Sequence, residues 1–164
     1  MVRIGILSDT HCFLHEKVFS FFTECNQIWH AGDIGNLETA ERLEKFKPFI
    51  AVYGNIDGQE LRVKYPEKQF IKVEQQRIFI THIGGTPAKY DAQAKKIIES
   101  TNPTIFVCGH SHICKIQYDQ KQKLLYINPG AAGKYGFHNK ITLLRFVIDG
   151  NNLKDMEILE LDKH

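Results

Sequence analysis

The sequence lacks several features that would place it in a specialised class of protein. No apolar run approaches the ~20 residues needed to cross a bilayer, so we expect no membrane partner. No charged leader precedes the strand-like residues 2–8, which indicates that there is no signal peptide. The four cysteines form no Cys-x-x-Cys pair and are typical of reduced thiols in a cytoplasmic protein. Repeats, low-complexity stretches and linkers are also missing, so we expect one domain over residues 1–164.

The charge balance argues against a protein that binds nucleic acid stably. The 21 basic and 19 acidic residues give a formal charge of only +2. A protein that binds duplex DNA usually carries a basic stripe, and none is evident, so we expect no stable nucleic-acid complex. A chain of 164 residues that is 43% hydrophobic can bury a substantial core. The aromatic C-terminal half could form a dimer face, which leaves a homo-oligomer open.

The spacing of apolar residues predicts an α/β fold. Strands at 2–8, 27–31 and 49–53 alternate with two helices, which makes a βαβαβ unit with a parallel sheet. Asn36 is expected to cap the second of these helices. The first helix is expected to bury one face, which carries Leu14, Val18, Phe21, Phe22 and Cys25.

The rest of the chain predicts a third helix and an antiparallel part. Thr86-Pro87 is expected to begin that helix. Asp149-Gly150 is expected to be the turn of a hairpin close to the end of the sequence. The remaining strands are predicted at 70–73, 78–81, 104–108, 113–118, 124–127, 141–148 and 153–161.

Seven side chains that can bind a metal ion follow the predicted strands. Because α/β sheets build their sites at the carboxyl ends of strands, we expect the seven to meet. A single Asp-x-His or Gly-Asn has an ordinary role in a turn or a cap, but five such motifs in order would rarely arise by chance. Two carboxylates, one amide oxygen and four imidazoles are too many for one ion and suit two. They are Asp9 and His11 in SDTH, Asp33 in HAGDI, Asn55 in YGNID, His82 in FITHIGG, and His110 and His112 in CGHSH.

This set of donors also predicts a reaction. Two divalent ions carry more positive charge than the carboxylates of Asp9 and Asp33 neutralise. The site therefore keeps a net positive charge that favours an anionic substrate. A carboxylate such as Asp33 can bridge two ions roughly 3.5–4 Å apart, and a water that they share becomes a bridging hydroxide, the nucleophile of a two-metal mechanism. The ions also neutralise charge on phosphoryl oxygens. We therefore expect a metal-dependent phosphoric ester hydrolase.

Over residues 4–130 these five blocks resemble the calcineurin-like metallophosphoesterases. The size of the chain and its INPG segment, residues 127–130, are similar to the small single-domain prokaryotic phosphodiesterase branch. The resemblance implies a four-layer α/β/β/α sandwich of two mixed sheets flanked by helices, and a small or activated phosphodiester as substrate. The expected ions are manganese first, with iron, nickel, cobalt or zinc as alternatives. The implied ligands are Asp9, His11, Asp33 and His112 for one ion, and Asp33, Asn55, His82 and His110 for the other.

Two positions depart from the pattern of the family. Many members have a histidine after the Asn55 position that acts as a general acid, whereas this chain has Ile56. Ile83 also separates His82 from the glycines that often follow it directly. Asp57 is retained and is expected to partner a ligand histidine. The candidates to replace the missing acid are His138 first and His30, whereas Lys134 and Tyr135 could reach a phosphate from the loop that carries His138. The predicted catalytic residues are Asp33, Asn55, Asp57 and His138.

Two other functions compete with this prediction. A nuclease on short oligonucleotides would be expected to show a basic groove. A catalytically weak scaffold, like the retromer subunit that shares this fold, would have no reason to keep all seven ligands. The retention of the complete set therefore favours the enzyme.

Overall fold

Three parallel strands form one side of the first sheet. The computed structural model describes residues 1–164. This sheet consists of β1 (Val2–Leu7), β2 (Gln27–His30), β3 (Phe49–Ala51), β11 (Lys140–Asp149) and β12 (Asn152–Asp162). Their order is β12-β11-β1-β2-β3, with β1, β2 and β3 parallel and the other two pairings antiparallel. The predicted parallel unit and the antiparallel hairpin are both confirmed.

The second sheet is mixed in the same way. It consists of β4 (Lys68–Val73), β5 (Gln76–Thr81), β8 (Ile105–Val107), β9 (Cys114–Asp119) and β10 (Leu124–Pro129). The order is β4-β5-β8-β10-β9. The three inner strands are parallel, and the two edge strands run antiparallel to their neighbours. Each strand lies within two residues of its predicted position.

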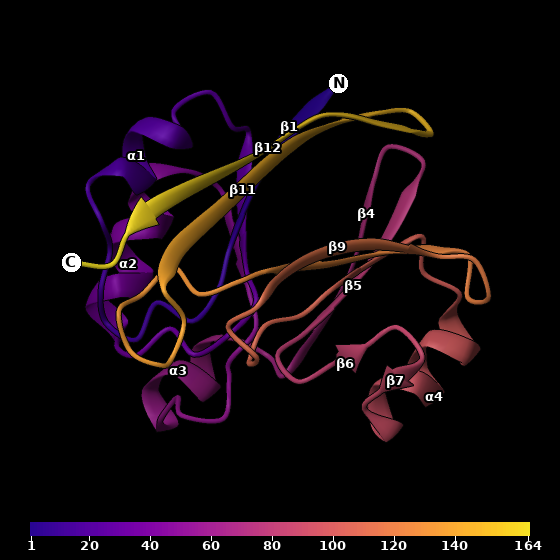
Figure 1. Cartoon of the computed structure of the whole chain (residues 1–164), viewed down its shortest axis with the longest axis horizontal. Helices are drawn as coiled ribbons and strands as arrows, with labels where there is room; N and C mark the ends of the chain where they lie inside the picture. The colour runs from indigo at the N-terminus through magenta and orange to yellow at the C-terminus, as the bar shows by residue number, and fades with distance from the viewer.

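The two sheets pack face to face and are flanked by helices. Ile6 and Trp29 of the first sheet and Ile80 and Val107 of the second belong to one buried cluster of 14 residues. Figure 1 shows the first sheet on the left and the second on the right. α1 (Lys17–Phe21) and α2 (Leu37–Phe46) cover the outer face of the first sheet, and α4 (Ala92–Thr101) covers that of the second. The predicted two mixed sheets with flanking helices are confirmed.

The helices differ from the predictions at three points, and the first two concern α1 and α3. α1 is shorter than expected because Leu14 and Cys25 reach the same apolar cluster from the flanking loops. α3 (Gln59–Lys64) was not predicted, since its six residues bury only Leu61 and show no periodicity. Asn36 caps α2 as predicted, and its side chain accepts a hydrogen bond from the Thr39 amide. No helix has the length and the apolar character needed to span a membrane.

The prediction that Thr86-Pro87 begins a helix is wrong. Thr86 belongs to a two-stranded ribbon of β6 (Gly85–Thr86) and β7 (Lys89–Tyr90). The helix begins later because Asp91 accepts a hydrogen bond from the Ala94 amide and so caps α4. Asp is as good a cap as Thr, and the ribbon uses the residues between them.

Candidate metal centre

All seven predicted ligands meet where strands of both sheets end. β1 leads to Asp9 and His11, β2 to Asp33, and β3 to Asn55 in the first sheet. In the second sheet, β5 leads to His82, and β8 leads to the loop that carries His110 and His112. The centre therefore lies across the junction of the two sheets.

The ligand atoms form two groups. Asp9, His11 and His112 can each offer an atom within 4.8 Å of the others, and so can Asp33, His82 and His110. Each group falls within one of the two ligand sets implied by the resemblance, while Asn55 belongs to neither group and Asp33 to one only.

Asp33 lies between the two groups. Its Oδ2 is 3.5 Å from Nε2 of His11 and 3.2 Å from Nε2 of His82. His112 Nε2 lies 3.1 Å from Asp9 Oδ1, and Asn55 Oδ1 lies 3.1 Å from His110 Nδ1. Oδ2 of Asp33 therefore lies within 3.5 Å of a histidine of each group.

The residues fit divalent ions because several buried polar atoms have no protein partner. Asp9 Oδ1, His11 Nε2 and His82 Nε2 are buried without a hydrogen bond. Buried polar groups without partners are rare and costly, and these three converge on one place. Carboxylate oxygens and imidazole nitrogens are ligands that manganese, iron and zinc accept.

Hydrogen bonds behind the ligands fix their orientation. His82 Nδ1 donates to the Ala31 carbonyl at 2.7 Å, which leaves Nε2 unprotonated and facing Asp33 in the neutral ring. Asp9 Oδ2 accepts from Ser8 Oγ at 2.7 Å and from the His110 amide at 3.1 Å. Asp33 Oδ1 accepts from the Ile56 amide at 3.0 Å, so Oδ2 is the oxygen directed at the histidines.

The backbone at the site is unusual. A left-handed conformation is uncommon for any residue except glycine and is strained when it clusters. Backbone hydrogen bonds hold the loops in this shape, for example from the Asp9 amide to the Gly32 carbonyl at 2.9 Å and from the His11 amide to the Asp33 carbonyl at 3.1 Å. Five of the seven predicted ligands have positive φ: Asp9 (53°), His11 (44°), Asp33 (58°), His110 (72°) and His112 (63°).

The two carboxylates stay ionised in spite of their burial. Burial alone would raise the pKa of Asp9, but the neighbouring imidazoles of His11 and His112 outweigh it and hold the pKa below its ordinary value. Burial likewise opposes ionisation of Asp33, and the neighbouring imidazole of His82 lowers the pKa. Both groups are therefore anions at neutral pH, as metal ligands must be.

Asp57 does not partner a ligand histidine, so that expectation is wrong. The buried carboxylate accepts hydrogen bonds from the amides of Ile34, Gly35 and Gly54, at 3.1, 2.9 and 2.8 Å. It thereby ties the loop after β2 to the loop after β3. Gly54 has to be glycine here, because a Cβ at this position would overlap the Asp33 side chain.

Two of the proposed replacement acids have structural partners. His30 is fully buried, accepts from the Gly32 amide and donates to Thr10 Oγ1 at 3.0 Å. Burial lowers its pKa to about 4, so the ring is neutral. His138 Nε2 donates to the Gly133 carbonyl at 2.7 Å, which leaves Nδ1 without a proton. Burial also lowers the pKa of His138, and this arrangement disfavours it as a proton donor.

Tyr135 and Lys134 occupy the same loop as His138. The ring of Tyr135 lies 4.9 Å from that of His11, and Lys134 Nζ lies over the ring of Phe13. Ile56 is 47% exposed at the edge of the site. Isoleucine offers no proton there, so the departure noted in the sequence leaves an apolar surface beside the centre.

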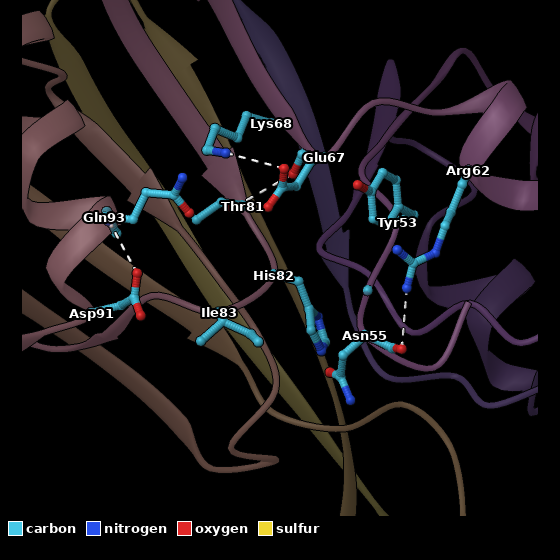
Figure 2. A pocket seen from close by; sticks show the side chains of 12 residues that line it. Tyr53, Asn55, Arg62, Glu67, Lys68, Thr81, His82, Ile83, Asp91 and Gln93 are labelled. Atoms are coloured by element: carbon cyan, nitrogen blue, oxygen red, sulfur yellow. Dashed lines mark hydrogen bonds and ion pairs between the residues drawn. The ribbon is translucent and has the colours of Figure 1, made fainter. Parts of the chain in front are cut away.

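A polar pocket of about 290 Å³ opens beside His82 and Asn55. Figure 2 shows these two side chains between Arg62 on the right and Gln93 on the left. Arg62 donates to the carbonyls of Asp57 and Asn55, and Lys68 also lines the pocket. Sequence reasoning missed these residues because α3 was not predicted, and no motif marks Lys68 or Gln93.

Comparison with known proteins identifies the family. A probable metallophosphoesterase of Methanothermobacter thermautotrophicus is 27% identical over 162 residues, which is 95% of this chain and 91% of the relative. Among solved structures, an archaeal phosphodiesterase has a TM-score of 0.73 at 22% identity and covers 96% of this chain and 99% of its own. Vps29 of Entamoeba histolytica, solved with Zn²⁺, has a TM-score of 0.73 at 18% identity, with 99% of each chain covered.

The match of a family pattern agrees with the geometry of the centre. The calcineurin-like phosphoesterase superfamily domain matches residues 2–151, which include all seven candidate ligands. Proteins of this family are metallophosphoesterases that use divalent metals. The chain therefore belongs to the calcineurin-like phosphoesterase superfamily.

Proposed function

We propose that the protein is a divalent-metal-dependent phosphodiesterase that hydrolyses a small or activated phosphodiester by a two-metal mechanism. The observation that carries the proposal is the position of Asp33, whose Oδ2 lies between His11 of one ligand group and His82 of the other. A single carboxylate in contact with both groups supports two ions held close together.

The residues of the chain prepare the site for an anionic ester. When bound, two divalent ions would lower the pKa of a shared water and neutralise charge on the phosphoryl oxygens. Asp33 and Asp9 remain ionised, and Asn55 contributes an amide at the edge of the polar pocket. Arg62 lines that pocket and adds positive charge, whereas Lys68 is paired with Glu67 at 3.2 Å. In the reaction the oxygen of water bonds to phosphorus, and the departing ester oxygen takes up a proton.

Two separate pockets favour a diester over a monoester. The polar pocket adjoins His82 and Asn55, and a second pocket of about 700 Å³ adjoins His110 and His112. A phosphodiester has two ester arms that leave the phosphorus in different directions, so each arm has a place. Ile56 supplies no proton to the leaving oxygen, which favours an arm that leaves as a stable anion.

Manganese is the proposed metal, with iron, nickel, cobalt and zinc as alternatives. The mixed nitrogen and oxygen ligands admit all of these ions. The Zn²⁺ complex of the Vps29 relative supports binding of a borderline metal by this fold. We also propose a small-molecule substrate in the cytoplasm, rather than a stable nucleic-acid complex, because the net charge is only +2.

A protein-binding platform of the retromer-subunit type is the alternative. The likeness to Vps29 fits this alternative without favouring it. The complete set of seven ligands and their convergence support the enzyme instead.

The proposed function can be tested on protein stripped of metal by a chelator. Phosphodiesters and monoesters that carry the same aryl leaving group are assayed with each of the five metals. We expect diester hydrolysis with manganese or a neighbouring metal, faster than monoester hydrolysis, and none with chelator. Turnover that is unchanged in stripped protein, or absent with every metal and every ester, would contradict the proposal.

A further inference from the structure

Three large apolar side chains stand in solvent beside the metal centre. Phe137 is fully exposed, Tyr135 is 70% exposed and Ile113 is 66% exposed. All three line the pocket of about 700 Å³ whose other walls include His110 and His112. A contiguous apolar surface in a concave place usually marks a binding site, whereas scattered exposed apolar residues need no explanation.

The loop that carries two of these side chains is fixed in place. We call residues 133–138 the aromatic loop. Lys163 Nζ donates to the carbonyls of Gly136 and His138, at 2.6 and 3.1 Å. His138 closes the loop by donating to the Gly133 carbonyl at 2.7 Å. These bonds fix the backbone of the loop, so a ligand need not order the chain that carries Tyr135 and Phe137.

Gly136 lets the aromatic loop lie against His112, one of the candidate metal ligands. Its φ is 125°, a conformation that favours glycine, and a Cβ there would overlap the ring of His112. The ring of His138 also lies edge-on to that of His112, with centroids 5.1 Å apart. An occupant of this pocket would therefore touch the side of the metal centre.

We propose that this pocket binds an aromatic arm of the substrate, so that the preferred ester carries a flat, uncharged aromatic group. The inference rests on the proposed function, since a phosphorus held at the two ligand groups directs one of its arms toward His112. Phe137 and Tyr135 offer faces and edges against which an aromatic ring packs favourably. The contrast with the charged pocket around Arg62 and Lys68 further favours an apolar arm on the side of the aromatic loop.

A small ligand fits these observations better than a docked protein. The apolar residues line a half-open pocket, and candidate metal ligands form part of its wall. A protein segment that filled the cavity would block the site on which the proposed function depends.

The test compares phenylphosphonate with methylphosphonate, which carry the same anionic head and no ester bond. Binding is measured by calorimetry on manganese-loaded protein, so that no turnover is needed. We expect phenylphosphonate to bind about tenfold more tightly, as the burial of much of one ring implies. The preference should fall to about twofold or less in Phe137→Ala combined with Ile113→Ala.

Two controls separate this result from other effects. Phe70→Ala removes another exposed aromatic, on β4 of the second sheet, and should keep the preference. Methylphosphonate should bind the double variant as it binds the wild type, since the anionic head is unaffected. Equal binding of both phosphonates to the wild type would overturn the proposal, as would a preference that survives in the double variant. A preference for phenylphosphonate in a protein that hydrolyses no diester would support the aromatic site. It would refute the proposed function only.

Discussion

The two sheets contribute different chemistry to one centre. The first sheet supplies both carboxylates, the amide of Asn55 and a single imidazole, His11. The second sheet supplies only imidazoles: His82, His110 and His112. Negative charge therefore comes from one layer of the sandwich and most neutral nitrogen donors from the other. Ions bound between them would link two layers that otherwise meet mainly through apolar contacts.

The largest effect is expected from removing the shared anion of the first sheet. Asp33→Asn keeps the shape of the side chain but removes charge from both ligand groups, so kcat/KM on an aryl phosphodiester should fall by about a thousandfold or more. The matched control is Asp149→Asn, the same change at a half-exposed carboxylate of the first sheet, which should keep its activity. An Asp33→Asn enzyme within tenfold of the wild type would contradict the bridging role.

His30 sharpens the comparison because it lies at the end of a first-sheet strand but is not one of the candidate metal ligands. Its folded pKa, about 4 as a result of burial, is lower than the ordinary 6.5, so the unfolded chain binds the extra proton. The contribution of His30 to the free energy of unfolding, about 3 kcal/mol, is fully present above about pH 6.5 and is lost as the pH falls toward 4. Denaturant unfolding in chelator at pH 7 and pH 4.5 should show a smaller loss in His30→Asn than in the wild type. Equal losses of stability in the variant and the wild type would show that His30 does not cause the loss at low pH.

Metal loading tests whether the ions connect the two sheets. Binding to the folded state alone should raise the free energy of unfolding by about 2.7 kcal/mol per ion at a hundredfold excess over Kd. His82→Ala, which removes a second-sheet donor, should reduce the rise in melting temperature. His15→Ala, a change outside both ligand groups, should not reduce it. A metal-independent melting temperature in the wild type would argue against a preformed site.

The smallest effect concerns Ile56, the apolar side chain beside the charged half of the centre. Ile56→His should raise the rate on alkyl esters more than on aryl esters, by at most about tenfold, below the ~10²–10⁴-fold of a fully placed general acid. Ile56→Leu is the control and should leave the ratio of the two rates unchanged. If the wild type already hydrolyses alkyl and aryl esters equally, another group provides the proton.

The sequence predicted the two sheets well because five strands, β1, β2, β3, β5 and β8, are short apolar runs that lead to a ligand motif. Residues 2–8, 27–31 and 104–108 carry a clear buried pattern, and the structure places strands there. The convergence of the seven ligands followed from the same rule, since parallel strands end at one edge. What identified the centre was the order of the motifs rather than any single residue.

The failures lie where a single residue or a short helix decides the structure. Asp91 caps α4 in place of Thr86 because a two-strand ribbon intervenes, and a ribbon of this length has no periodicity to detect. α3 and Arg62 were missed for the same reason. Asp57 was assigned to a histidine, although a carboxylate next to a tight turn has backbone amides nearer to it.

The left-handed backbone of the ligands has a consequence for the speed of metal exchange. The amides of Asp9 and His11 bond to carbonyls of the neighbouring loop, so protein hydrogen bonds support the strained shape. An arriving ion then has little chain entropy to remove. Its rate of entry should be governed by how readily it sheds its own hydration water, and the two amides should already resist hydrogen exchange in metal-free protein.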